Sequence, residues 1–135
     1  MKVIMPEIRE FAERYTAAWC SHDPTRVASF FSPRGSLRIN DSAPAVGREE
    51  ITAAARGFMT AFPDLKVEMD GLEEAGERTI YRWTLTGTFR GPGGIGQCVH
   101  VSGFEEWLLG PDGLVVDSRG HFDETAYEQQ LRAGH

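Results

Sequence analysis

Cysteine is scarce in this sequence, and long apolar runs are missing from it. The 135 residues include two cysteines, Cys20 and Cys98, which lie far apart and have no Cys-x-x-Cys spacing. Neither a disulfide framework nor a zinc site built on paired cysteines is therefore predicted. No apolar stretch approaches the length of a signal peptide core or a membrane span, so we expect a cytoplasmic protein without a membrane partner.

Positive charge is also in short supply. There are 14 lysines and arginines against 20 aspartates and glutamates, which gives a formal net charge of −6. Nucleic acids and anionic lipids are bound by clustered cations, so we expect neither as a partner. The apolar share of 41% and aromatic share of 10% are those of an ordinary globular chain. The length suits a single domain over residues 1–135 with a core of its own.

Three segments in the first half of the chain have the pattern of helices. Residues 6–21 place apolar side chains at spacings of three and four, which predicts an amphipathic helix. Asp23-Pro24 combines an N-cap with proline at the first helical position, and it predicts a short helix carrying Val27, Phe30 and Phe31. A further helical run follows Gly47 and ends at Pro63.

The second half of the chain has the pattern of strands. We expect a short strand over 36–40, a turn over 41–44, another short strand over 65–69, and long strands over 78–89, 97–109 and 114–122. Gly110-Pro111-Asp112-Gly113 predicts the turn of a hairpin, and a last helix is expected from about Asp123. Helices followed by a meander predict an α+β fold, with helices packed on one face of a curved antiparallel sheet.

Side chains alternate between the two faces of a strand, so the expected hairpin can be sorted into faces. The apolar face would hold Val99, Val101, Gly103, Glu105, Trp107, Val116, Ser118, Gly120 and Phe122. The polar face would hold His100, Ser102, Glu106, Asp117, Arg119, His121 and Asp123. A β-bulge would exchange these assignments over part of a strand.

Glu105 stands out because it is a carboxylic acid on an otherwise apolar face. Such a group is paired, protonated or next to a ligand. It is either a structural glutamate bonded to a neighbouring Tyr, Trp or Arg, or a functional group in a cavity.

Metal and nucleotide sites are weakly indicated. His121, Asp123 and His100 could form a ligand set or an acid–base pair, but one pair does not complete a coordination shell. The alternatives are an N-cap role for Asp123 and a solvent-facing His121. Residues 91–96 spell G-x-G-x-x-G, yet a strand follows them where a dinucleotide site needs a helix, so we expect a hairpin loop. No metal and no cofactor is predicted.

Several strings along the chain form a recognisable set. They are Val46-Gly47-Arg48-Glu49-Glu50-Ile51, Ala61-Phe62-Pro63-Asp64-Leu65, Trp83-Thr84-Leu85-Thr86-Gly87-Thr88, residues 91–96, Gly103-Phe104-Glu105-Glu106-Trp107 and Gln129-Gln130-Leu131. In this order they resemble the SnoaL-like branch of the nuclear transport factor 2-like superfamily, which is related to ketosteroid isomerases and polyketide cyclases. The resemblance covers nearly the whole chain. It implies a cone-shaped α+β fold whose curved sheet and helices enclose an apolar cavity, commonly as a homodimer.

The resemblance also implies roles for individual residues. Tyr15 and Glu105 match positions where ketosteroid isomerases keep hydrogen-bond donors to an enolate. Their base would correspond to Asp41, facing inward, or to Asn40 after a slip of one residue, which would remove the base. The resemblance to polyketide cyclases implies a Trp-Asp pair in the last strand, but the aligned positions in this chain are Arg119-Gly120. That departure argues against cyclase chemistry of this kind.

The leading hypothesis is a proton-transfer enzyme of the isomerase or cyclase type that acts on an apolar cyclic carbonyl compound. The alternatives are a non-catalytic module for ligand binding or dimerisation, and an epoxide-hydrolase-like site that would need an arginine such as Arg82 or Arg119 beside two carboxylates. We expect the small apolar molecule to be bound by Trp19, Phe30, Asn40, Phe58, Phe62, Trp83, Val101, Trp107, Ser118 and Phe122.

Overall fold

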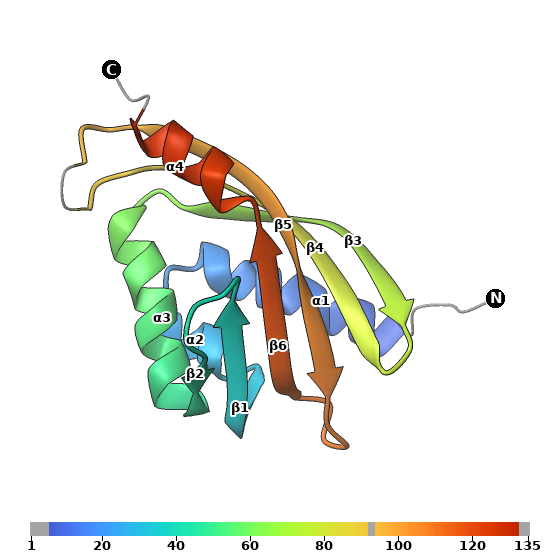
Figure 1. Ribbon diagram of the computed structural model, residues 1–135. Helices are drawn as coiled ribbons and strands as arrows, with labels where there is room; N and C mark the ends of the chain where they lie inside the picture. Colours follow the sequence, from blue (N-terminus) through green and yellow to red (C-terminus); the bar gives the residue numbers. More distant parts are fainter. Residues whose placement is uncertain (1–5, 92–93, 133–135) are drawn as a thin grey trace.

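The structure is a computed structural model that describes residues 6–91 and 94–132, and it confirms the α+β class. Over this range, four helices and six strands follow one another in the chain (Figure 1). Their order is α1 (Pro6–Cys20), α2 (Pro24–Ala28), β1 (Phe31–Ile39), β2 (Ala45–Val46), α3 (Gly47–Ala61), β3 (Lys66–Ala75), β4 (Arg78–Thr88), β5 (Cys98–Leu109), β6 (Val115–Phe122) and α4 (Glu124–Arg132).

The strands form one curved sheet in the order β2-β1-β6-β5-β4-β3. The sheet is mixed, because β1 pairs with β6 in parallel while the other neighbours are antiparallel. In Figure 1, α1 and α3 cover one side of the sheet, and α4 crosses its end beyond β6. β4 and β5 pair from Thr79↔Trp107 to Thr88↔Cys98, so residues 89–97 connect two antiparallel strands. Of the glycine-rich segment expected to connect them, Pro92 and Gly93 lie outside the described residues.

The start of α2 follows from its capping residues. The Asp23 side chain accepts hydrogen bonds from the backbone N–H groups of Thr25 and Arg26, at 3.1 and 3.3 Å, and Pro24 occupies the first turn. The predicted length was wrong, because α2 ends at Ala28 and Phe31 already belongs to β1. Pairing with β6 overrides the helical pattern at this point, since Phe31 is the partner of Val115.

Two strands are longer than their sequence pattern suggested. β1 includes residues 32–35, which precede the strand predicted over 36–40, and an irregularity between Phe31 and Ser36 accommodates them. β3 continues to Ala75 past a register shift between Met69 and Gly71. In both strands a bulge carries the chain along its neighbour beyond the point where the alternation of apolar and polar residues breaks down.

The β5–β6 hairpin has the predicted turn but contains a bulge. Gly113 takes a positive φ of 81°, and its N–H donates to the Gly110 carbonyl at 2.9 Å. The register shifts between Leu108 and Leu109. As a result Val115 is fully buried and Val116 is 39% exposed, which reverses the face predicted for Val116. From Ser118 onward the predicted faces hold.

The core fills the space between the helices and the inner side of the sheet. Trp107, Tyr15 and Tyr81 are among its largest buried side chains. The rings of Tyr81 and Trp107 stack at 4.8 Å, and the Tyr15 ring stands edge-on to Trp107 at 5.3 Å. Among the residues described, none of the helices has both the length and the apolar character needed to cross a membrane.

Candidate functional site

Glu105 lies on the inner side of β5, on the face that the alternation predicted. It is 8% exposed and accepts hydrogen bonds from three neutral side chains. The Tyr15 hydroxyl donates to Oε2 at 3.0 Å and to Oε1 at 3.2 Å. Trp107 Nε1–H donates to Oε1 at 3.0 Å, and the Ser118 hydroxyl donates to the same oxygen at 2.8 Å. One helix and two strands therefore converge on one carboxyl group.

Burial governs the electrostatics of this group. Loss of hydration raises the pKa of Glu105 above its ordinary value of 4.5, and the bonds from Trp107, Ser118 and Tyr15 oppose the rise only in part. Burial and the neighbouring Glu105 carboxyl likewise raise the pKa of Tyr15. No cationic side chain of the described residues contributes to the Glu105 shift. Glu105 therefore stays protonated to higher pH than a glutamate in water does.

An apolar cavity opens in front of Glu105. Its volume is about 70 Å³, several times the roughly 10–15 Å³ that one water molecule needs. Tyr81 reaches the lining but holds its hydroxyl against Thr16. The lining consists of Trp19, Leu37, Ile39, Phe58, Phe62, Val67, Tyr81, Trp83, Leu85, Val101, Glu105, Gly120, Phe122 and Tyr127.

Six of the expected ligand-binding residues lie on this lining: Trp19, Phe58, Phe62, Trp83, Val101 and Phe122. Trp107, Ser118 and Phe30 do not line it. Trp107 and Ser118 are fully buried and bond to Glu105. Phe30 packs against Tyr15 with the ring centroids 5.7 Å apart. These three residues support the site from behind the cavity wall.

Tyr15 also lies behind the cavity wall. It is fully buried and is not part of the lining, and its hydroxyl donates its hydrogen bond to Glu105. A direct bond from Tyr15 to an enolate, as the resemblance implied, would require this hydrogen to leave Glu105. Glu105 is the group that faces the cavity, and Tyr15 stands behind it.

The base expected at the end of the first strand is not in the cavity. Asp41 is exposed and lies outside the lining, so the prediction that it faces inward was wrong. Asn40 is also absent from the lining. It has a positive φ of 51°, its Oδ1 accepts from the Phe122 N–H at 3.0 Å, and its Nδ2 donates to Glu124 at 3.0 Å. This left-handed residue turns the chain away from the cavity and links the end of β1 to the start of α4.

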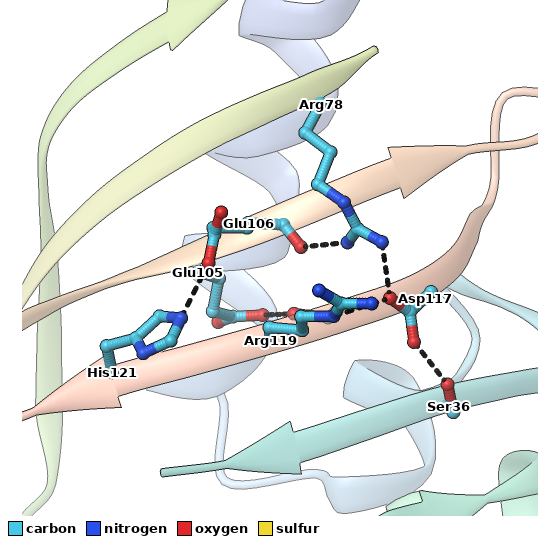
Figure 2. A network of polar contacts seen from close by, with 8 residues as sticks. Ser36, Arg78, Glu105, Glu106, Asp117, Arg119 and His121 are labelled. Atoms are coloured by element: carbon cyan, nitrogen blue, oxygen red, sulfur yellow. Dashed lines mark hydrogen bonds and ion pairs between the residues drawn. The ribbon is translucent and has the colours of Figure 1, made fainter. Parts of the chain in front are cut away.

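The secondary candidates lie apart from the cavity and do not converge. His121 Nε2 and Glu106 Oε2 are 2.6 Å apart on the outer face of the sheet, where Figure 2 shows them. Asp123 accepts from the Ala126 N–H at 3.1 Å, which is the N-cap alternative. His100 is exposed, and its backbone bonds to Gln130. Within residues 6–91 and 94–132, no three His, Cys, Asp or Glu side chains gather as a metal site.

Several lining residues were not among the expected ligand-binding residues. Tyr81 and Leu85 share a strand face with Trp83, so extending the alternation argument to β4 would have found them. Gly120 lies directly opposite Glu105 in the β5–β6 register, and a side chain there would have its Cβ 3.8 Å from the Glu105 Cγ. Tyr127 lies on α4, and only the position of that helix brings it to the cavity. The others are Leu37, Ile39 and Val67.

Comparison with known proteins identifies the family. The chain belongs to the SnoaL-like polyketide cyclase family, whose model matches residues 9–131. No curated protein matches the sequence. Three similar solved structures are a SnoaL-like protein from Jannaschia sp. CCS1, AclR from Streptomyces galilaeus, and a ketosteroid-isomerase-like protein from Catenulispora acidiphila in complex with trimethylamine.

These structures support the fold over almost the full length of the chain. The Jannaschia protein has a TM-score of 0.84 at 22% identity, covering 98% of this chain and 99% of its own. AclR has a TM-score of 0.80 at 26% identity, with coverage of 96% and 98%. The Catenulispora protein has a TM-score of 0.80 at 15% identity, with coverage of 96% and 95%. The family includes cyclases and related enzymes, and the roles of individual residues depend on the geometry of this site.

Proposed function

We propose that this protein transfers protons on a small apolar carbonyl compound, with Glu105 as the acid and base. The observation that supports this proposal is a single buried carboxyl group on the wall of an otherwise apolar cavity. A carboxyl group with a raised pKa is better matched to proton transfer near neutral pH than one in water. The apolar lining would hold the hydrocarbon part of the substrate and exclude water.

In the proposed reaction, ionised Glu105 takes a proton from a carbon next to the carbonyl. The C–H bond breaks, an O–H bond forms on the carboxyl group, and the electron pair moves into the carbonyl to give an enolate. The neutral acid then returns the same proton to another atom of the enolate, or the enolate carbon attacks a second carbonyl and the acid protonates the new alkoxide. Glu105 ends each cycle ionised, so no co-reactant is needed.

The hydroxyls of Tyr81 and Tyr15 are not free to bind the enolate oxygen. The Tyr81 hydroxyl on the lining is engaged by Thr16, and the Tyr15 hydroxyl behind the wall is engaged by Glu105. An enolate oxygen without these two donors is stabilised less by the site. The substrate class that fits is therefore a carbonyl compound whose enolate is delocalised over its own conjugated system.

Among the described lining residues there is neither the second carboxylate nor the arginine that the epoxide-hydrolase-like alternative needs. Arg82 pairs with Glu73, and Arg119 pairs with Asp117 with 59% of its side chain exposed, so neither arginine enters the lining. Ligand binding without catalysis remains a second candidate, because the apolar wall alone would suffice for it.

The test is deuterium exchange into 2-tetralone, whose enolate is conjugated with its ring, followed by NMR in D₂O. We expect the wild-type protein to accelerate exchange next to the carbonyl, and Glu105→Gln to lose about 100-fold or more of that acceleration. For cyclohexanone, whose enolate lacks such conjugation, we expect the protein to accelerate exchange much less. The matched control is Glu106→Gln, which changes the next residue on the outer face and should exchange like wild type.

Two results would refute the proposal. One is exchange that survives Glu105→Gln at the wild-type rate. The other is stabilisation of the protein by 2-tetralone in a thermal-shift assay with no acceleration of exchange, which would favour the ligand-binding alternative.

A further inference from the structure

The two oxygens of Glu105 are held differently. Oε1 accepts from Trp107 Nε1–H at 3.0 Å, from Ser118 Oγ–H at 2.8 Å and, more distantly, from Tyr15 at 3.2 Å. Of the side chains in the described part of the chain, Tyr15 alone donates to Oε2, at 3.0 Å. One oxygen is therefore surrounded by donors, whereas the other retains bonding capacity.

The donors differ in how far they can adapt to a protonated partner. An indole N–H can only donate, so Trp107 requires a lone pair on Oε1. The Ser118 hydroxyl is fully buried, and Glu105 is its only side-chain hydrogen-bond partner among the described residues. A proton on Oε1 would compete with both donors, and the Ser118 hydrogen would be left without an acceptor in the core.

We infer that Trp107 and Ser118 are positioning residues that keep the proton of neutral Glu105 on Oε2, so that this one oxygen exchanges protons with the ligand. The exchange of protons with a ligand rests on the proposed function. The position of the proton on Oε2 is a property of the protein without a ligand. Trp107 and Ser118 touch the carboxyl group from behind the cavity wall and do not meet the ligand themselves.

The surroundings of Glu105 leave few other groups that could move this proton. The titratable groups beside it are the hydroxyls of Tyr15 from α1 and Tyr81 from β4, and Tyr127 of α4 lines the same cavity. Burial raises the pKa of all three hydroxyls. Glu105 is the only acidic or basic side chain among the described lining residues. The cross-strand partner Gly120 contributes no side chain.

The experiment follows the infrared carbonyl band of Glu105 in protein labelled with ¹³C-glutamate, as a function of pH and without any ligand. The Glu105 band is identified as the one that Glu105→Gln removes. Ser118→Ala and Trp107→Phe each remove one donor that stabilises the ionised form. We expect each to lower the acid dissociation constant of Glu105 by roughly tenfold or more and to shift the carbonyl frequency of the neutral acid.

The controls separate positioning from a general loss of structure. Ser102→Ala removes a hydroxyl on the outer face of the same strand, and it should leave the Glu105 titration unchanged. For exchange of 2-tetralone, Ser118→Ala should move the pH profile to higher pH together with the titration. A folded Ser118→Ala and a folded Trp107→Phe that both keep the wild-type titration and band would overturn the inference.

The two proposals fail in different ways. If Glu105→Gln retains full exchange, the proposed function fails while the infrared titration still decides the position of the proton. If the titration does not respond to Ser118→Ala and Trp107→Phe while Glu105→Gln abolishes exchange, the inference fails and the proposed function stands.

Discussion

Two carboxyl groups of the β5–β6 hairpin lie on opposite faces and have opposite electrostatics. Glu105 faces the cavity, where loss of hydration dominates and raises its pKa. Asp117 faces outward. Burial alone would raise its pKa too, but bonds from Ser36 and Arg78 and the charges of Arg78 and Arg119 together lower it. Figure 2 shows the outer network, in which Arg78 reaches Asp117 at 2.8 Å.

The difference shows what each face is built to do. Asp117 has cationic partners, so its ionised form is stabilised and serves to hold the strands together. Glu105 has only neutral donors, so its charge is never fully compensated and the group can give up or take a proton at modest cost. A carboxyl group left in this state inside a protein is a candidate functional group.

The largest expected effect is a loss of stability on the inner face. Trp107→Ala removes a fully buried ring that stacks on Tyr81, and it should lower the free energy of unfolding by about 3–5 kcal/mol. Arg119→Ala, on the exposed outer face, should change it by no more than about 0.5 kcal/mol. Urea denaturation of both variants tests this contrast, and equal losses would contradict it.

The next effect is a pair of opposite pH dependences. The unfolded chain releases the Glu105 proton near pH 4.5, whereas the folded chain holds it to higher pH, so the free energy of unfolding falls as pH rises through this range. Glu105→Gln removes that fall, and its stability relative to wild type should rise with pH from about 4.5.

Asp117 should behave in the opposite way. Its contribution is present above the unfolded pKa of 3.8 and is lost as pH falls through the lower folded value. Asp117→Asn should therefore cost about 1 kcal/mol or less at pH 7, and nothing in strong acid. Denaturation at a series of pH values measures both variants, and slopes of the same sign would show that the two faces do not differ as described.

The most local effect concerns α4, which brings Tyr127 to the cavity. Gln130 accepts from the His100 N–H at 2.6 Å and donates to the His100 carbonyl at 2.9 Å, which fastens the helix to β5. Gln130→Ala should weaken this docking by about 1–2 kcal/mol and speed hydrogen exchange of the α4 amides. Gln129→Ala, at the exposed neighbouring position, is the matched control and should exchange like wild type.

Much of the fold could be predicted because local signals agreed with the tertiary structure. The cap at Asp23-Pro24, the turn before Gly113 and the alternation around Glu105 all hold. Errors occurred where pairing with a distant strand overrode the local pattern, as at Phe31, and where a bulge changed the alternation, as at Val116. The expected homodimer stays a prediction, since it depends on a second copy of the chain.

The candidate site was predicted in part. Strand parity was enough to place Glu105 inward, and the helical stripe was enough to bury Tyr15. Neither pattern could show that the Tyr15 hydroxyl donates its hydrogen bond to Glu105, or that Asn40 turns the chain so that Asp41 is exposed. Both facts depend on distances between segments that local patterns do not specify.

The amino-acid sequence by itself determined which residues alternate, cap and turn, and through the alternation it determined that an acid would face the apolar side of β5. Only the tertiary structure decided that this acid meets three neutral donors and no cation. The reason is that face assignment depends on neighbours along the chain, whereas the pKa and the partners of a buried group depend on residues up to 90 positions away that the folded sheet and helix α1 bring together.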